Sequence, residues 1–128
     1  MTGERSWREL MRTGGDCCRC GRDAAAVACY ERALAIVQAM IDDGQLNEPL
    51  LLAKVAAHQA RAAALARLCA LVEAERELAS AHRFIRDVVH DRSLSQSLRR
   101  AAQAHCARTF AEWQALRRRY GLAPMTWH

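Results

Sequence analysis

The sequence is poor in aromatic residues and proline, and it has no strand-like pattern. Aromatic residues make up 5% of the 128 residues, and there are two prolines. Runs of β-branched and aromatic residues, which are typical of strands, are absent, whereas alanine is abundant. These absences exclude a sheet-based fold and favour helices packed closely through small side chains. The length suits a single domain with a buried core.

Lysine and long apolar runs are also scarce. Lys54 is the one lysine among 19 cations, which exceed the 14 acids only mildly and alternate with them along the chain. This interleaving is typical of a solvated helix face and argues against nucleic-acid binding. No run approaches the ~18 apolar residues of a membrane span, and the charged first 11 residues lack the apolar core of a secretion signal. We therefore expect a cytoplasmic protein that does not associate with a membrane.

Cysteine is more frequent than in most cytoplasmic proteins. A reducing compartment keeps thiols free, so the even number of six cysteines is weak evidence for disulfides. Free cysteine in such a protein is most often a small buried packing residue. The six are Cys17, Cys18, Cys20, Cys29, Cys69 and Cys106.

One stretch, residues 14–34, predicts an architecture. Its small residues and one aromatic residue have spacings that let two antiparallel helices pack with little between their backbones. Here the chain resembles a tetratricopeptide repeat, whose 34-residue pattern is a helical hairpin with a turn glycine and with alanines around an aromatic residue. The resemblance implies a scaffold that binds other proteins. The matching residues are Gly14, Gly21, Ala26, Tyr30, Ala33 and Leu34.

The first hairpin is predicted from helices at about 4–19 and 23–43. Gly14 lowers helix propensity by ~1 kcal/mol relative to alanine, which suggests that the second helix crosses closely at that point. Gly21 supplies the turn, Asp23 is a candidate N-cap, and Gly44 ends the second helix.

A second hairpin is predicted to repeat this plan without its motif. Its first helix starts after the N-cap Asn47 and runs to about Leu71, and a turn at 72–74 leads into a helix with Glu75 and Glu77 in its first turn. The apolar stripes align with those of the first hairpin at an offset of 52 residues, and the turn glycine and aromatic residue are missing.

A fifth helix is predicted from about Leu94 or Ser95 to Tyr120, ended by Gly121 and Pro124. Four residues mark its start: Asp91, Ser93, Ser95 and Ser97. The fold class is therefore all-α, with about five antiparallel helices. They form two stacked hairpins similar to tetratricopeptide repeats and a long C-terminal capping helix. One domain covers residues 1–121, and a loose tail covers 122–128, although Trp127 in that tail is able to fold back.

Two groups of residues have ligand chemistry. Cys17 and Cys20 have the CxxC spacing of zinc and redox motifs, but no second pair follows, so packing is the simpler reading. His58, His82 and His105 lie on or beside the apolar stripes of three successive helices. They suit hydrogen-bonded core positions, a polar groove, or a shared metal site. A metal-responsive or metal-storing protein that uses these five residues is the alternative function.

The main prediction is a binding module without enzymatic activity or cofactor. The chain contains no phosphate loop, no nucleophile elbow and no paired inward carboxylates. The first, third and fifth helices are expected to line a concave face that holds an extended or helical peptide, as in an adaptor or chaperone. Bacterial type III secretion chaperones are one example of such modules. The candidate contacts are Arg12, His58, Arg61, His105 and Arg108.

Two further features leave the assembly open. The densest basic run, Arg117 to Arg119, suits either solvated cations at a helix C-terminus or docking to an acidic protein. The tryptophans lie near the chain ends and fit either the core or the contacts of a homodimer. They are Trp7, Trp113 and Trp127.

Overall fold

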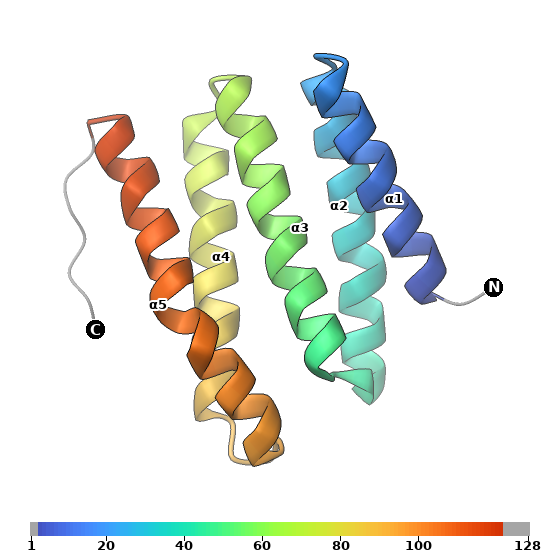
Figure 1. Ribbon diagram of the computed structural model, residues 1–128, viewed down its shortest axis with the longest axis vertical. Coiled ribbons are helices and arrows are strands. Elements are labelled where there is room, and N and C mark those ends of the chain that lie inside the picture. The colour runs from blue at the N-terminus through green and yellow to red at the C-terminus, as the bar shows by residue number, and fades with distance from the viewer. Residues whose placement is uncertain (1–2, 122–128) are drawn as a thin grey trace.

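The computed structural model describes residues 3–121, which form a bundle of five long helices (Figure 1). The all-α prediction with five antiparallel helices is confirmed, and residues 3–121 contain no strand. The predicted loose tail and Trp127 lie outside the described residues. The elements are α1 (Gly3–Arg19), α2 (Asp23–Met40), the π-helical turn η1 (Ile41–Gln45), α3 (Glu48–Arg67), α4 (Leu71–His90) and α5 (Gln96–Arg119).

The helices form two layers. Each helix packs against the next one in the chain, and α1, α3 and α5 lie nearer the viewer in Figure 1 with α2 and α4 behind them. The α1–α2 turn, the α3–α4 turn and the end of α5 lie together at one end of the bundle. We call α1, α3 and α5 the front layer, and α3 occupies its centre.

The core lies between the two layers. Its largest fully buried side chains are Leu51, Ile85 and Val37, which come from α3, α4 and α2. One cluster joins α3, α4 and α5, and another joins α1, α2 and α3 through Trp7 and Leu50. Full burial of each such aliphatic side chain stabilises the fold by about 1.5–3 kcal/mol. The N-terminal half of α3 belongs to both clusters, so α3 connects the two halves of the bundle.

The first hairpin depends on a close approach of α1 to Tyr30 of α2. A Cβ atom placed on Gly14 would lie 2.5 Å from Cε1 of the Tyr30 ring, a separation that real Cβ atoms do not show. Tyr30 is 5% exposed and packs with Ala26 and Ala64. The expectation that Gly14 marks a close helix crossing is confirmed.

Both hairpins turn through a residue in the left-handed region, although only the first has glycine there. Gly21 has a φ of 72°, and Cys69 has a φ of 62°. In each turn this residue and the next one donate backbone hydrogen bonds to carbonyls in the last turn of the preceding helix. The predicted turn at 72–74 is therefore wrong. Because Cys69 takes the role of the turn glycine, α3 ends at Arg67 and α4 begins at Leu71.

This turn also corrects the register of the repeat. Cys69 follows Gly21 by 48 residues rather than by the predicted offset of 52. At the offset of 48, buried residues of the first hairpin coincide with buried residues of the second. Glu73, rather than Glu75 or Glu77, is the acid in the first turn of α4. The buried pairs are Gly14 with Ala62, Ala26 with Ala74, Tyr30 with Leu78, Ala33 with Ala81, and Val37 with Ile85.

Side chains cap the N-termini of α3 and α5, whereas the residue predicted to cap α2 does not do so. Asn47 accepts a hydrogen bond from the backbone N–H of Leu50 at 3.0 Å. The predicted cap at Asn47 is therefore confirmed. Ser95, one of the four residues that mark the predicted start of the fifth helix, accepts a hydrogen bond from the backbone N–H of Leu98 at 3.1 Å and is the N-cap of α5. Asp23 is not the cap of α2. It is the first helical residue, and its carboxylate accepts a hydrogen bond from Arg67 Nε at 2.8 Å.

The end of α2 differs from the predicted boundary at Asp43. The α-helix ends at Met40 and continues as the wider turn η1, in which Gly44 has a φ of 80°. The segment Asp23–Gln45 is long and apolar enough to cross a membrane by length and composition alone. A helix in the core of a soluble protein passes the same test, and α2 buries Ala33 and Val37 against its neighbours.

The neighbouring glycines of α1 provide a matched test of this close crossing. We expect Gly14→Ala to lower the free energy of unfolding by about 1–2 kcal/mol, because overpacking against Tyr30 outweighs the gain in helix propensity. Gly15→Ala should instead raise it by about 0.5–1 kcal/mol, since the nearest atom to its new Cβ lies at 3.6 Å. Urea unfolding at pH 7 measures both. A stabilising Gly14→Ala would contradict the crossing.

The two turns allow a reciprocal exchange. Cys69→Gly should raise the free energy of unfolding by about 1 kcal/mol, because glycine adopts a positive φ without steric cost. Gly21→Ala should lower it by a similar amount, and no atom lies within 4 Å of the added Cβ, so only backbone strain contributes. Thermal or urea unfolding measures both changes in the free energy of unfolding. Changes of opposite sign in the two variants would confirm the shared turn geometry, and changes of the same sign would refute it.

Candidate protein-binding face

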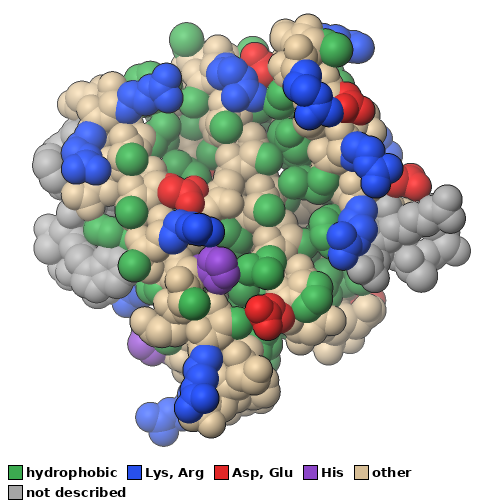
Figure 2. All heavy atoms as spheres, in the orientation of Figure 1, with side chains coloured by type: hydrophobic (Ala, Val, Ile, Leu, Met, Phe, Trp, Pro, Cys, Tyr) green, Lys and Arg blue, Asp and Glu red, His purple; other side chains and the backbone are tan. Residues whose placement is uncertain are grey.

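The outward side of α3 is apolar although it faces solvent. Leu52 is 37% exposed, and Ala56 and Ala63 are exposed on the same side of the helix. The adjoining side of α3, about 100° around the helix, buries Leu51 and Val55 in the core. A helix that is apolar on both sides is typical of one that is covered on both sides. In the described chain, α1 and α5 flank the outward side of α3 without covering it (Figure 2).

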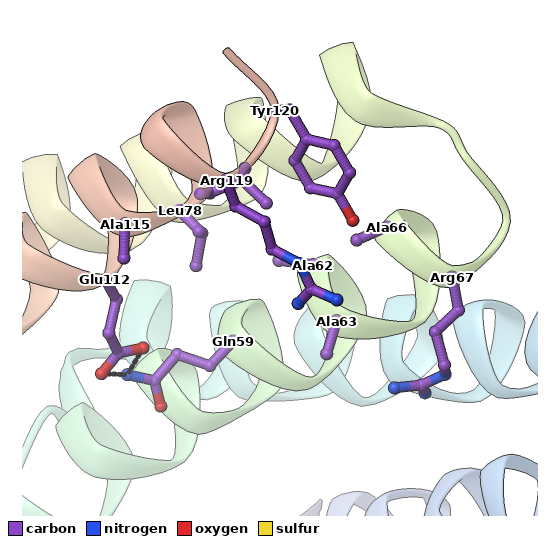
Figure 3. Close-up of a pocket in the computed structure, with 11 residues that line it drawn as sticks. Gln59, Ala62, Ala63, Ala66, Arg67, Leu78, Glu112, Ala115, Arg119 and Tyr120 are labelled. Atoms are coloured by element: carbon purple, nitrogen blue, oxygen red, sulfur yellow. Dashed lines mark hydrogen bonds between the residues drawn. The ribbon is translucent and has the colours of Figure 1, made fainter. Parts of the chain in front are cut away.

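A hollow of about 530 Å³ lies between α3 and α5. Figure 3 shows its alanine floor, with Arg119 and Tyr120 reaching over it from the end of α5. At one side, the amide Nε2 of Gln59 donates to both carboxylate oxygens of Glu112 at 2.9 and 2.8 Å, which links the two helices. Leu78 of α4 contributes to the lining from the layer behind. The alanines that line it are Ala62, Ala63, Ala66 and Ala115.

A second hollow of about 520 Å³ lies between α1 and α3. Trp7 and Arg8 line it from α1, with the Arg8 guanidinium carbon 4.7 Å from the centre of the Trp7 ring. Pro49 and Leu52 line it from α3. The outward stripe of α3 therefore has a hollow on each side, and we call this surface the front face.

Cations border the front face on both flanking helices. On α5, His105, Arg108, Glu112, Ala115 and Arg119 follow one another at alternating spacings of three and four residues, which places them on one side of the helix. Three of them line the hollow. On α1, Arg12 is exposed one turn beyond Arg8. Figure 2 shows hydrophobic side chains between two sides that carry Lys and Arg. The predicted contacts Arg12, His105 and Arg108 thus lie on the sides of α1 and α5 that border the front face.

The side chains of His58 and Arg61, both predicted as partner contacts, instead pair with a carboxylate inside the fold. His58 Nδ1 lies 2.6 Å from a carboxylate oxygen of Glu77 in α4, and Arg61 pairs with the other oxygen of Glu77. Arg61 also lies 3.6 Å from the carboxylate of Glu31 in α2. Neither residue lines either hollow. These side chains join α3 to the rear layer instead of facing a partner.

The polar cluster keeps His58 neutral. Burial, together with the charges of the nearby Lys54 and Arg61, lowers the pKa of His58 to about 4. The carboxylate of Glu77 favours the charged imidazole, but Arg61 already neutralises it. His58 Nε2 is buried without a hydrogen-bond partner, so a proton there would remain unsatisfied. We therefore assign Nδ1 as the donor to Glu77.

His82 is a structural residue between α4 and α5. Its Nδ1 lies 2.8 Å from Oγ1 of Thr109, which in turn donates to the carbonyl of Cys106 at 3.0 Å. Burial, followed by the charge of Arg86, lowers the pKa of His82. His82 and Thr109 are 4% and 2% exposed, so a substrate could not reach this pair. The contact serves helix packing.

The structure separates the residues of the metal alternative. His58 contacts Glu77 and His82 contacts Thr109, while His105 lies half-buried on the α5 surface. Cys17 packs beside the Tyr30 cluster, whereas Cys20 is exposed at the end of α1. Among residues 3–121, no group of three His, Cys, Asp or Glu side chains is arranged to hold a metal ion.

The residues of the hollows were missed because alanine carries no chemical signature. A signal was present in the third helix, whose apolar residues include a second stripe of Leu52, Ala56 and Ala63, about 100° around the helix from Leu51 and Val55. Two apolar stripes on one helix predict two covered sides. Sequence reasoning used only the inner stripe.

The His58 cluster makes stability depend on pH. The unfolded chain binds a proton near pH 6.5 that the folded protein accepts only near pH 4, so His58 stabilises the fold above pH 6.5 and this contribution is lost as the pH falls. We expect His58 to lower the free energy of unfolding by about 2 kcal/mol between pH 7 and pH 5. His58→Gln should remove this part, while the part due to His82 remains. Urea unfolding at the two pH values measures the difference.

His90 provides the matched control for this test. It is exposed at the end of α4, so His90→Gln removes an imidazole without disturbing the Glu77 cluster. Between pH 7 and pH 5, the free energy of unfolding of this variant should still fall by the amount that depends on His58. Equal pH slopes in the wild type and His58→Gln would show that the cluster does not govern the titration.

One comparison with known proteins identifies a family for this chain. No curated protein sequence and no solved structure matches the chain. A family model described as "Protein of unknown function (DUF2753)" matches residues 5–126, which include all five helices apart from the first two residues of α1. The chain therefore belongs to the DUF2753 family.

Proposed function

We propose that the protein is a non-enzymatic protein-protein interaction module that binds an acidic amphipathic segment of a partner on its front face. The observation that carries the proposal is the exposed apolar stripe of α3, with Leu52, Ala56 and Ala63 between two hollows. The role is that of a cytoplasmic adaptor or chaperone.

Shape and size support a helical or extended peptide as the occupant. The two hollows of about 530 and 520 Å³ lie on opposite sides of α3, so a bound segment would fill one or both with apolar side chains. Small residues such as Ala63 and Ala66 allow a partner backbone to approach closely. A small molecule suits the face less well, because both hollows are shallow and open along the helices.

Charge supports an acidic partner. The chain carries a formal net charge of +5, and the exposed residues Arg12, Arg108 and Arg119 lie on the flanking helices. Guanidinium groups pair with carboxylates in a bidentate manner, which would orient the partner at the edges of an apolar contact. His58 and Arg61 have no direct part in this proposal because Glu77 engages both.

The repeat plan supports the same proposal. Two hairpins with matching buried positions, followed by one further helix, resemble a short tetratricopeptide array with a capping helix. In such arrays, the first helices of successive hairpins line the binding surface, and α1, α3 and α5 hold the corresponding places here.

A site-specific photo-crosslinker tests the proposal in the native cell. Placed at Ala63, it should join the protein to a discrete partner, because that residue lies in the α3–α5 hollow. The same group at Ala28, an exposed residue of α2 in the rear layer, is the control. The partner segment, purified and added back, should bind the wild type at 1:1 stoichiometry by calorimetry.

A substitution then separates loss of binding from loss of folding. Ala63→Arg should reduce affinity at least tenfold, while Ala28→Arg leaves affinity unchanged, and both exposed substitutions should alter stability by less than about 0.5 kcal/mol. Equal crosslinking at the two positions, or unchanged affinity with Ala63→Arg, would contradict the proposal.

A further inference from the structure

The described part of the chain ends at the rim of the α3–α5 hollow. Arg119, the last residue of α5, and Tyr120, its C-cap, both line this hollow. Seven more residues, Leu122 to His128, follow Gly121 in the sequence, and we call them segment 122–128. The family model extends to residue 126, so most of this segment belongs to the region that the family model covers.

The end of α5 has the geometry that reverses the chain in both hairpin turns. Gly121 has a φ of 72°, and its N–H donates to the carbonyl three residues earlier, as the N–H groups of Gly21 and Cys69 do in their turns. At such helix ends, the residue after the left-handed one commonly packs on an apolar side chain in the last turns of the helix. This motif favours a contact of Leu122 with Leu116, and Leu116 lines the hollow.

The side of α5 that faces α4 is already filled by contacts. Trp113 donates an indole hydrogen bond to Glu75 at 3.3 Å, and Arg117 pairs with the same carboxylate. Phe110 packs edge-on against Trp113. The hollow on the α3 side is not filled in this way, so a segment that turns back at Gly121 meets free space there.

Segment 122–128 has the large apolar side chains that the hollow lacks. Four alanines line the hollow of about 530 Å³, which leaves room above them (Figure 3). The segment contains no Asp, Glu, Lys or Arg, and its large apolar residues are Leu122, Met125 and Trp127. A buried indole removes about 150–250 Å² from water, and the guanidinium groups of Arg67 and Arg119, which also line the hollow, can stack on it.

The segment is long enough to cross the hollow. Seven extended residues span about 23 Å. Along α5 the hollow extends from Tyr120 back to Glu112, which is about 12 Å at the rise of an α-helix. Ala63 lines the wall that α3 contributes. Trp127 is therefore far enough along the chain to reach that wall.

We propose that segment 122–128 occupies the α3–α5 hollow of its own chain, with the indole of Trp127 on the alanine floor. A partner that uses this hollow must then displace the segment, so the segment regulates the front face by competing for one of its two hollows. The α1–α3 hollow stays free for a first contact with the partner. The competition rests on the proposed function, whereas the docking of the segment does not.

Fluorine NMR of the purified full chain tests the docking without any partner. Biosynthetic fluorotryptophan gives one resonance for each tryptophan, and Trp127→Phe identifies that of Trp127. We expect this resonance to be shifted from its position in a synthetic peptide of residues 120–128, and to be at least threefold less broadened by a soluble paramagnetic chelate. Ala63→Arg should move it to the peptide position, whereas Ala28→Arg on the rear layer should leave it in place.

Three results would overturn the docking. The first is a Trp127 resonance that coincides with that of the peptide. The second is a shifted resonance that Ala63→Arg leaves in place, because the segment would then lie on another surface. The third is a shift that grows with protein concentration, because the segment would then occupy a second copy of the chain. Circular dichroism verifies that both arginine variants keep their helix content.

A variant of the segment itself keeps the test independent of changes to α3. Trp127→Ala should lower the melting temperature by a few degrees, because it removes the buried indole, and an unchanged melting temperature would contradict the docking. The same variant should bind the partner segment identified by crosslinking at Ala63 at least threefold more tightly than the wild type, and equal affinity would contradict the competition. A docked Trp127 without any crosslinked partner would support the docking and count against the proposed function alone.

Discussion

The close approach of α1 to Tyr30 is the contact on which the first half of the structure depends. Because Gly14 lacks a Cβ, the α1 backbone lies against a buried aromatic ring, and the small residues Ala26 and Ala33 keep α2 near. In the second hairpin, Ala62 and Leu78 occupy the positions equivalent to Gly14 and Tyr30. A larger side chain on one helix thus accompanies a smaller one on the other, as close packing at a fixed helix separation demands.

Polar contacts determine which helix faces meet between the two layers. Glu77 of α4 receives both His58 and Arg61 from α3, and Glu75 receives Trp113 and Arg117 from α5. These acids lie two residues apart on α4 and therefore point toward different neighbours. Apolar burial provides most of the stability, whereas specific hydrogen bonds define which helix faces meet.

The sequence was informative where a residue has one dominant structural use. Gly14 predicted a close crossing and Asn47 predicted a helix cap, both of which the structure confirms. It was misleading at Cys69, because a non-glycine residue in the left-handed region has no sequence signal, and this moved the fourth helix and the repeat register by four residues. Similarly, a histidine on an apolar stripe does not reveal its partner. His58 was expected to be available to a partner protein, but Glu77 of the next helix engages it, and the spacing of residues along α3 gave no sign of that contact.

The composition of α3 explains why the front face is the surface to probe. An odd number of helices in two layers leaves three in front, and the central one has its inner side covered by α2 and α4. Its polar residues His58 and Arg61 point toward this interior, where carboxylates receive them, and its outward side keeps Leu52, Ala56 and Ala63. Solvation alone would favour the reverse distribution, because burying polar groups costs free energy unless each finds a partner. Because the inner side of α3 is already buried against the rear layer, its apolar outward side is the part of the helix that remains uncovered, and the proposed partner contact rests on that feature.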